Sequence, residues 1–104
     1  MKVNILNAKK TREMINSKQF KLIIDLREEE SYLEGHLPNA INIPTNEIND
    51  NLDYIRSITN QDILLYCSAG NQSVAVGKIL LLEGFNNIYS LANGTKYYKY
   101  ELYK

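Results

Sequence analysis

The only cysteine of the chain, Cys67, follows the apolar run 63–66 and opens a loop of small and polar residues. That loop continues with Ser68, Ala69, Gly70, Asn71, Gln72 and Ser73. The mostly apolar residues 74–82 come next and favour a helix. A thiol that faces a helix N-terminus lies in the positive potential of free backbone N–H groups, which favours the nucleophilic thiolate. Cys67 is therefore the candidate nucleophile.

The loop after Cys67 is suited to binding an anion through its backbone. Gly70 permits a positive φ angle, which helps to turn successive N–H groups toward one point. Surroundings of this kind lower a cysteine pKa from about 8.5 to ~3.5–7.5. The alternative is a buried cysteine that packs as a small hydrophobic side chain. The order of strand, cysteine, small-residue loop and helix favours the reactive site.

Short apolar runs alternate with helical patterns along the chain. We expect strands at residues 3–6, 22–26, 40–43, 63–66 and 87–91. We expect helices over Ala8–Asn16 with Asn7 as N-cap, Glu28–Glu34 ending at Gly35, Asn46–Ile55 with Thr45 as N-cap, Ser73–Glu83 before Gly84, and Thr95–Tyr103. This alternation predicts an α/β domain with a mainly parallel sheet. Ligands bind at the carboxyl ends of such strands, where Cys67 is expected to lie.

The totals set limits on the class of protein. The 104 residues suit one domain, 1–104, and twelve basic residues balance twelve acidic ones. A neutral chain gives no reason to expect nucleic acid or an anionic membrane as partner. A single cysteine excludes an intrachain disulfide and supplies no zinc ligand set. With no apolar run near the ~20 residues of a membrane span and no secretory signal, we expect a cytoplasmic protein.

Three segments, in order and at matching spacing, carry a family resemblance. The first is residues 23–27 (Ile-Ile-Asp-Leu-Arg) followed by 32–44 (Tyr-Leu-Glu-Gly-His-Leu-Pro-Asn-Ala-Ile-Asn-Ile-Pro), the second is 66–73 with a Cys-x-x-Gly-x-x-Ser loop, and the third is 91–94 with Tyr98. Together they resemble the rhodanese-like domains, particularly the small single-domain thiosulfate sulfurtransferases. The resemblance covers nearly the whole chain. It implies a three-layer α/β sandwich, with about five mainly parallel strands and helices on both faces.

The resemblance also implies a reaction. The Cys67 thiolate would attack the sulfane sulfur of a donor such as thiosulfate, and a thiol or cyanide acceptor would take that sulfur from the resulting persulfide. Backbone N–H groups of residues 68–73 would bind the substrate, and the resemblance implies no metal or organic cofactor. The second hypothesis is a non-enzymatic module, which would relay sulfur from a protein donor to a protein acceptor or simply bind a protein.

The loop departs from the family pattern in its charge. Asn71 and Gln72 stand where many members carry an arginine, so we expect weak affinity for dianionic thiosulfate. Related phosphatases and arsenate reductases need Cys-x5-Arg to hold an oxyanion, and the residue at that spacing is Ser73. Phosphoryl transfer is therefore disfavoured. Asn39 and Asn93 replace family glycines, and asparagine tolerates a left-handed backbone better than most residues.

Other polar residues have structural roles as their simplest explanation. The only histidine, His36, lies in a Gly-His-Leu-Pro turn and is expected to pack rather than to serve as a base. Asp25 and Arg27 flank Leu26 and are expected to form an ion pair, although Arg27 could instead add positive potential near the loop. We expect the tyrosines at 97, 98, 100 and 103 to pack a C-terminal helix, with the exposed rings free to meet a partner.

Overall fold

The fold is built on one five-stranded sheet, as the computed structural model describes it over residues 2–104. The strand order is β1-β5-β4-β2-β3, and every neighbouring pair is parallel. The strands are β1 (Asn4–Leu6), β2 (Leu22–Asp25), β3 (Ile41–Asn42), β4 (Gln61–Tyr66) and β5 (Asn86–Leu91). The helices are α1 (Ala8–Asn16), α2 (Glu29–Glu34), α3 (Leu52–Ile58) and α4 (Asn71–Leu82). The predicted parallel α/β architecture is confirmed.

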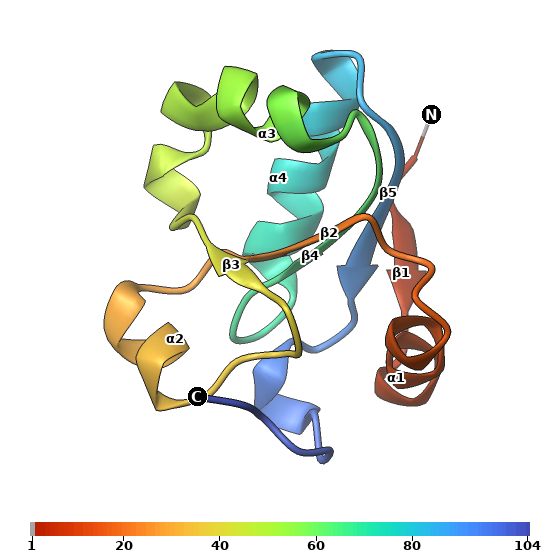
Figure 1. Ribbon diagram of the computed structural model, residues 1–104, viewed down its shortest axis with the longest axis vertical. Coiled ribbons are helices and arrows are strands. Elements are labelled where there is room, and N and C mark those ends of the chain that lie inside the picture. Colours follow the sequence, from red (N-terminus) through yellow and green to blue (C-terminus); the bar gives the residue numbers. More distant parts are fainter. Residues whose placement is uncertain (1) are drawn as a thin grey trace.

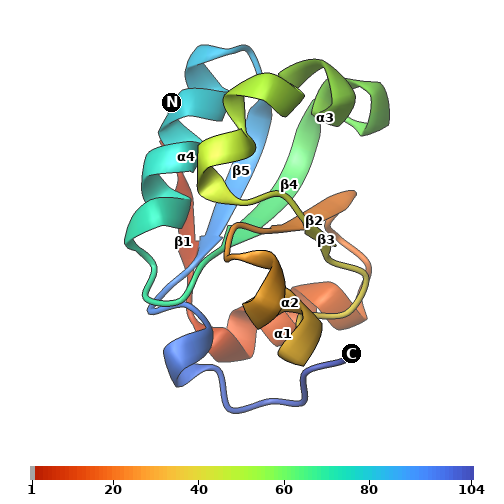
Figure 2. The same ribbon diagram turned by 90° about the vertical axis from the view of Figure 1, so that its left-hand side faces the viewer.

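Helices cover both faces of the sheet, which gives three layers (Figures 1 and 2). Because side chains alternate along a strand, Leu65 of β4 joins the core beneath α3 and α4, whereas Leu64 joins the core on the α1 side. Both leucines are fully buried. The β4 sequence therefore does not alternate between apolar and polar residues, because both faces of the strand pack against apolar side chains. The helices within residues 2–104 are all too short or too polar to cross a membrane.

The predicted end signals of α1 and α4 are confirmed. The Asn7 side chain accepts a hydrogen bond from the Lys10 backbone N–H at 2.8 Å and so caps α1. Gly70 has a φ of 100° and Gly84 a φ of 93°, so the left-handed residues flank α4 as expected. α4 begins at Asn71, two residues before the expected Ser73, so the last half of the predicted loop is the first helical turn.

The predicted helix Asn46–Ile55 with Thr45 as N-cap is wrong. Two 3₁₀ helices, Thr45–Glu47 and Asn49–Asn51, precede α3. The Thr45 backbone N–H donates to the Leu26 carbonyl at 3.1 Å, which holds Thr45 at the end of β2. The run Asn49-Asp50-Asn51 also has low helix propensity, because short polar side chains compete for backbone hydrogen bonds.

The predicted C-terminal helix Thr95–Tyr103 is also wrong. Only Thr95–Tyr97 forms a 3₁₀ helix. His36 and Tyr103 instead exchange two backbone hydrogen bonds of 2.8 Å, which draw the end of the chain alongside the turn before β3. Backbone groups at the end of the chain therefore form hydrogen bonds with residues distant in sequence instead of the bonds of a helix. Tyr98 is buried in the α1-side core, whereas Tyr97 is 60% exposed.

Candidate active site

Cys67 lies just beyond β4, the central strand, and is 3% exposed. Its Sγ accepts a hydrogen bond from the Gly70 backbone N–H at 3.1 Å. The Ser73 hydroxyl oxygen lies 3.6 Å from the same sulfur. Ser73 belongs to the first turn of α4 and is fully buried. The thiol is therefore held between the left-handed turn at Gly70 and the N-terminus of a twelve-residue helix.

The net effect of these surroundings is a lowered pKa at Cys67. Burial raises the pKa of the thiol, because a charged sulfur loses its water. Hydrogen bonds from the Ser73 hydroxyl and from the backbone N–H groups of Ser73, Gly70 and Ala69 lower it by more in sum. A thiolate stabilised in this way requires no neighbouring base.

The six predicted loop residues divide into two groups. The Gly70 N–H binds the sulfur at 3.1 Å, and the backbone N–H groups of Ala69 and Ser73 also help to lower the pKa of the thiol. The exposed residues at 68, 69, 71 and 72 join Cys67 around a hollow of about 240 Å³. The Gln72 side-chain oxygen lies 3.1 Å from the Thr45 hydroxyl, so the loop is tied to the segment that follows β3.

A second and larger hollow adjoins the first. It measures about 460 Å³ and shares Ser68 and Gln72 with the hollow over Cys67. Its other lining residues are Leu26, Arg27, Glu28, Ser31, Pro44, Thr45 and Asn46. The Arg27 guanidinium is largely engaged, because it forms a 2.7 Å ion pair with fully buried Asp25 and donates to the Gly35 carbonyl at 2.6 Å. The predicted ion pair is confirmed, and it lies beside the site.

His36 has the predicted packing role. Its ring stacks on Tyr32 with a centroid distance of 4.1 Å, and its Nδ1 lies 3.0 Å from the Tyr32 carbonyl oxygen. Its backbone is the pairing partner of Tyr103. These contacts occupy the imidazole and its main chain in holding the turn before β3.

Residues 93–96 support the thiol loop from behind, and the sequence alone did not reveal this. The Thr95 and Lys96 backbone N–H groups donate to the Cys67 and Ser68 carbonyls, each at 3.0 Å. A Cβ at Gly94 would overlap both of those carbonyl groups. Segment 91–94 stood out only through its resemblance to the family, which did not say what it contacts. Asn39 and Asn93 have φ angles of 63° and 62°, so the expected left-handed backbone is confirmed at both.

Ser90 on β5 is a second residue that sequence inspection missed. It is fully buried, and its hydroxyl oxygen lies 2.7 Å from that of Ser73. Its one sequence signal is a polar side chain between the buried residues Ile88 and Leu91 of a core strand. Only the tertiary structure shows that this side chain faces the first turn of α4.

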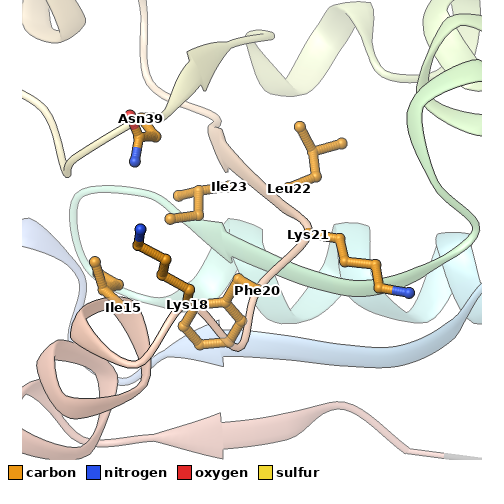
Figure 3. A pocket seen from close by; sticks show the side chains of 7 residues that line it. All are labelled: Ile15, Lys18, Phe20, Lys21, Leu22, Ile23 and Asn39. Atoms are coloured by element: carbon orange, nitrogen blue, oxygen red, sulfur yellow. The ribbon is translucent and has the colours of Figure 1, made fainter.

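Another hollow of about 290 Å³ lies away from the thiol, at the start of β2 (Figure 3). Lys18 and Phe20 are among its lining residues, and it includes none of the loop residues 67–73. Figure 3 shows the Lys18 side chain extending toward Asn39. Within residues 2–104, no group of three or more His, Cys, Asp or Glu side chains is placed to hold a metal ion.

Comparisons with known proteins agree with this geometry. The rhodanese-like domain family matches residues 7–101. A curated relative, the tRNA uridine(34) hydroxylase of Buchnera aphidicola, is 30% identical over 86% of this chain but only 30% of its own length. The chain spans 26% of the same enzyme from Hamiltonella defensa.

Two solved structures show the fold. A rhodanese-related protein of Thermoplasma volcanium superimposes with a TM-score of 0.81 at 26% identity, over 96% of this chain and 97% of its own. A human single-domain sulfurtransferase superimposes with a TM-score of 0.75 at 16% identity, over 90% and 93%. With a family match that runs through four of the five strands, the thiol loop and its support, the chain belongs to the rhodanese-like domain family.

Proposed function

We propose that this domain is a sulfurtransferase that carries sulfane sulfur on Cys67, from thiosulfate or another persulfide donor to a thiol or cyanide. The observation that carries the proposal is the Cys67 sulfur itself. It accepts the Gly70 N–H at 3.1 Å and opens onto a hollow formed by its own loop. Family membership supports the same chemistry. The reactive group is a free thiol, which suits the reducing cytoplasm.

The first half-reaction transfers one sulfur atom to the protein. A lone pair of the Cys67 thiolate forms a bond to the outer sulfur of thiosulfate, and the sulfur–sulfur bond of the donor breaks. Sulfite leaves with that electron pair, and a persulfide anion remains on Cys67. No proton moves and no oxidant is consumed. The loop N–H groups stabilise the anionic sulfur before and after the step.

The second half-reaction returns Cys67 to its starting state. A cyanide or thiolate acceptor attacks the terminal sulfur of the persulfide, and the bond between the two sulfurs breaks. Cys67 leaves as a thiolate, which is a better leaving group when its pKa is low. The larger hollow beside Gln72 gives room for the rest of an acceptor molecule. Its lining carries both Arg27 and Glu28 and therefore has no strong charge of one sign.

A second candidate function is a persulfide relay or protein-binding module without turnover of its own. Two observations favour it. The exposed part of the loop is uncharged, which suits a protein donor better than a small dianion. The chain also spans less than a third of the first curated relatives, which are named tRNA uridine(34) hydroxylases. In such a setting, the domain would exchange sulfur with another protein or with another part of a larger one.

Intact-mass measurement after incubation with thiosulfate tests the proposal. We expect a gain of one sulfur, about 32 Da, as the mark of a covalent persulfide intermediate. The Cys67→Ser variant should show no gain. Cyanide added to the loaded protein should restore the original mass and release thiocyanate.

The donor distinguishes the two candidates. Loading by a low-molecular-weight persulfide but not by thiosulfate would favour the relay over the thiosulfate enzyme. Protein that gains no sulfur from either donor, while its thiol still reacts with iodoacetamide, would contradict both sulfur-carrying functions and leave only the protein-binding module.

A further inference from the structure

Three buried groups form a line from the sheet interior to the reactive sulfur. Ser90 and Ser73 are fully buried, and Cys67 is 3% exposed. The Ser90 and Ser73 hydroxyl oxygens are 2.7 Å apart, and Ser73 Oγ lies 3.6 Å from Cys67 Sγ. The parallel register pairs Ser90 of β5 with Leu65 of β4, which places its side chain close to the carboxyl end of β4. Two buried hydroxyl groups therefore stand in series behind the thiol.

The count of protons determines which way these hydrogen bonds point. The Ser73 hydroxyl has a single proton. Besides the Ser90 oxygen, two acceptors lie within reach of that proton, the Cys67 sulfur and the Gly70 carbonyl at 3.2 Å. A neutral thiol can donate to Ser73, which leaves the Ser73 proton free for Gly70. A thiolate can only accept. Stabilising the thiolate therefore requires the Ser73 proton to turn toward the sulfur.

With Ser90 as the donor between the two serines, the Ser73 proton has only the Gly70 carbonyl and the Cys67 sulfur as acceptors, and an anionic sulfur is the stronger of the two. Once Ser73 donates to the sulfur, its own oxygen is free to accept, and the Ser90 hydroxyl is at 2.7 Å. A donor at this position polarises the Ser73 O–H and strengthens its bond to the anion. It also prevents the Ser73 proton from pointing toward Ser90.

We propose that Ser90 is a positioning residue, which donates to Ser73 so that the Ser73 proton is directed onto the Cys67 sulfur. These two donors in series, Ser90 to Ser73 and Ser73 to the Cys67 sulfur, stabilise the thiolate both as the attacking group and as the leaving group. The leaving-group role rests on the proposed sulfur transfer. Thiolate formation does not, so a failure of sulfur transfer and a failure of this inference give different results.

The experiment measures the rate of Cys67 alkylation by iodoacetamide as a function of pH. Ser90→Val and Ser90→Thr form a matched pair, because the two side chains have nearly the same shape and only threonine keeps a hydroxyl. Ser90→Ala covers the case in which the larger side chains do not fit. The alkylation rate rises with pH as the thiol ionises, and the midpoint of this rise reports the pKa of Cys67. We expect the midpoint to rise by about 0.5 pH unit in the valine and alanine variants. Below the midpoint, this corresponds to about threefold slower alkylation. The threonine variant should keep the wild-type midpoint.

Two further variants test whether Ser90 acts through Ser73. Ser73→Ala should raise the midpoint more than Ser90→Ala does, because it removes the group that contacts the sulfur. In the Ser73→Ala background, Ser90→Ala should have no further effect. Thr11→Val removes a fully buried hydroxyl from α1 and serves as the remote control, with an unchanged midpoint.

A purely structural role for Ser90 would lower stability without moving the pH profile. The proposal is therefore overturned if Ser90→Ala, folded by circular dichroism, keeps the wild-type midpoint. It is also overturned if the threonine and valine variants share one midpoint, or if Ser90→Ala shifts the profile equally with and without Ser73.

Discussion

At the scale of single residues, Cys67 depends on neutral groups. Residues 68–73 carry no formal charge, so the sulfur anion is stabilised by backbone N–H groups and a serine hydroxyl. Hydrogen bonds to a charged group contribute about 1.5–3 kcal/mol each, enough to outweigh the effect of burial on the pKa of the thiol. They act only within contact distance, however, and do little to attract a dianion from solution. Reactivity and substrate affinity are therefore separable at this site.

The first prediction concerns Gln72→Arg. Gln72 lines both the hollow over Cys67 and the larger one beside it, so a guanidinium there would face an approaching donor. We expect the KM for thiosulfate to fall about tenfold, since ~1.4 kcal/mol of added attraction changes affinity by that factor. Steady-state kinetics of thiocyanate formation at low ionic strength measures this KM.

The control for this substitution is Gln19→Arg. It makes the same charge change on an exposed residue before β2, at the opposite end of the sheet from Cys67. Its KM should remain at the wild-type value. Equal effects from the two variants would mean that net charge, and not the position of Gln72, governs affinity.

At the scale of elements, the thiol loop is held between α4 and residues 93–96. Gly94, with a φ of 60°, packs its bare backbone against the Cys67 and Ser68 carbonyl groups. Gly84 shares the left-handed backbone, with a φ of 93°, but a Cβ there would meet nothing within 4 Å. The two glycines thus share a positive φ, but Gly94, with a ψ of −160°, lies in a region that only glycine readily adopts, and it alone touches the thiol loop.

This contrast leads to the second prediction. Gly84→Ala should lower the free energy of unfolding by about 1–2 kcal/mol, the cost of a left-handed alanine, without altering Cys67. Gly94→Ala should lower it by ~3 kcal/mol or more and slow Cys67 alkylation, because the loop must move away from the new methyl group. Urea unfolding and alkylation rates measure both effects. Unchanged alkylation in folded Gly94→Ala protein would show that the loop geometry does not depend on this support.

At the scale of the whole molecule, one sheet separates two apolar cores. Leu64 and Leu65 are neighbours in β4, both fully buried, and each belongs to a different core. Since both cores share the central strand, neither layer of helices has a sheet of its own to pack on. We therefore expect the domain to unfold in one cooperative step.

The third prediction uses this pair of leucines. Leu64→Ala and Leu65→Ala should each lower the free energy of unfolding by about 2–5 kcal/mol, because each leaves a cavity in a closed core. In both variants, the urea transitions followed by far-UV circular dichroism and by tyrosine fluorescence should coincide. Separate transitions, with only one displaced by a given variant, would mean that the two layers unfold independently.

Some parts of this structure could be predicted from local pattern. The apolar runs at β2 and β4, the Asn7 cap and the left-handed Gly70 are each set by residues within a few positions. The C-terminal helix could not be predicted correctly. Tyr103 pairs with His36, far away in sequence, and Thr95 pairs with the Cys67 carbonyl, and neither partner is visible in the local pattern. Thr45 failed as a cap for the same reason, because its N–H is bound to the end of β2.

The candidate site likewise has one part that the local sequence indicates and another part that depends on contacts between distant residues. The sequence by itself indicated the candidate cysteine, the loop after it and the helix that follows, because these are contiguous and their chemistry depends on residue type. Only the tertiary structure decided what lies behind them. The parallel register of β4 and β5 brings Ser90 to Ser73, and the close approach of Gly94 locks the loop carbonyls. Hydrogen bonds between strands and loops that are distant in sequence set these positions. Which of these groups meet depends on how the chain folds in space and not on the residues next to them in sequence.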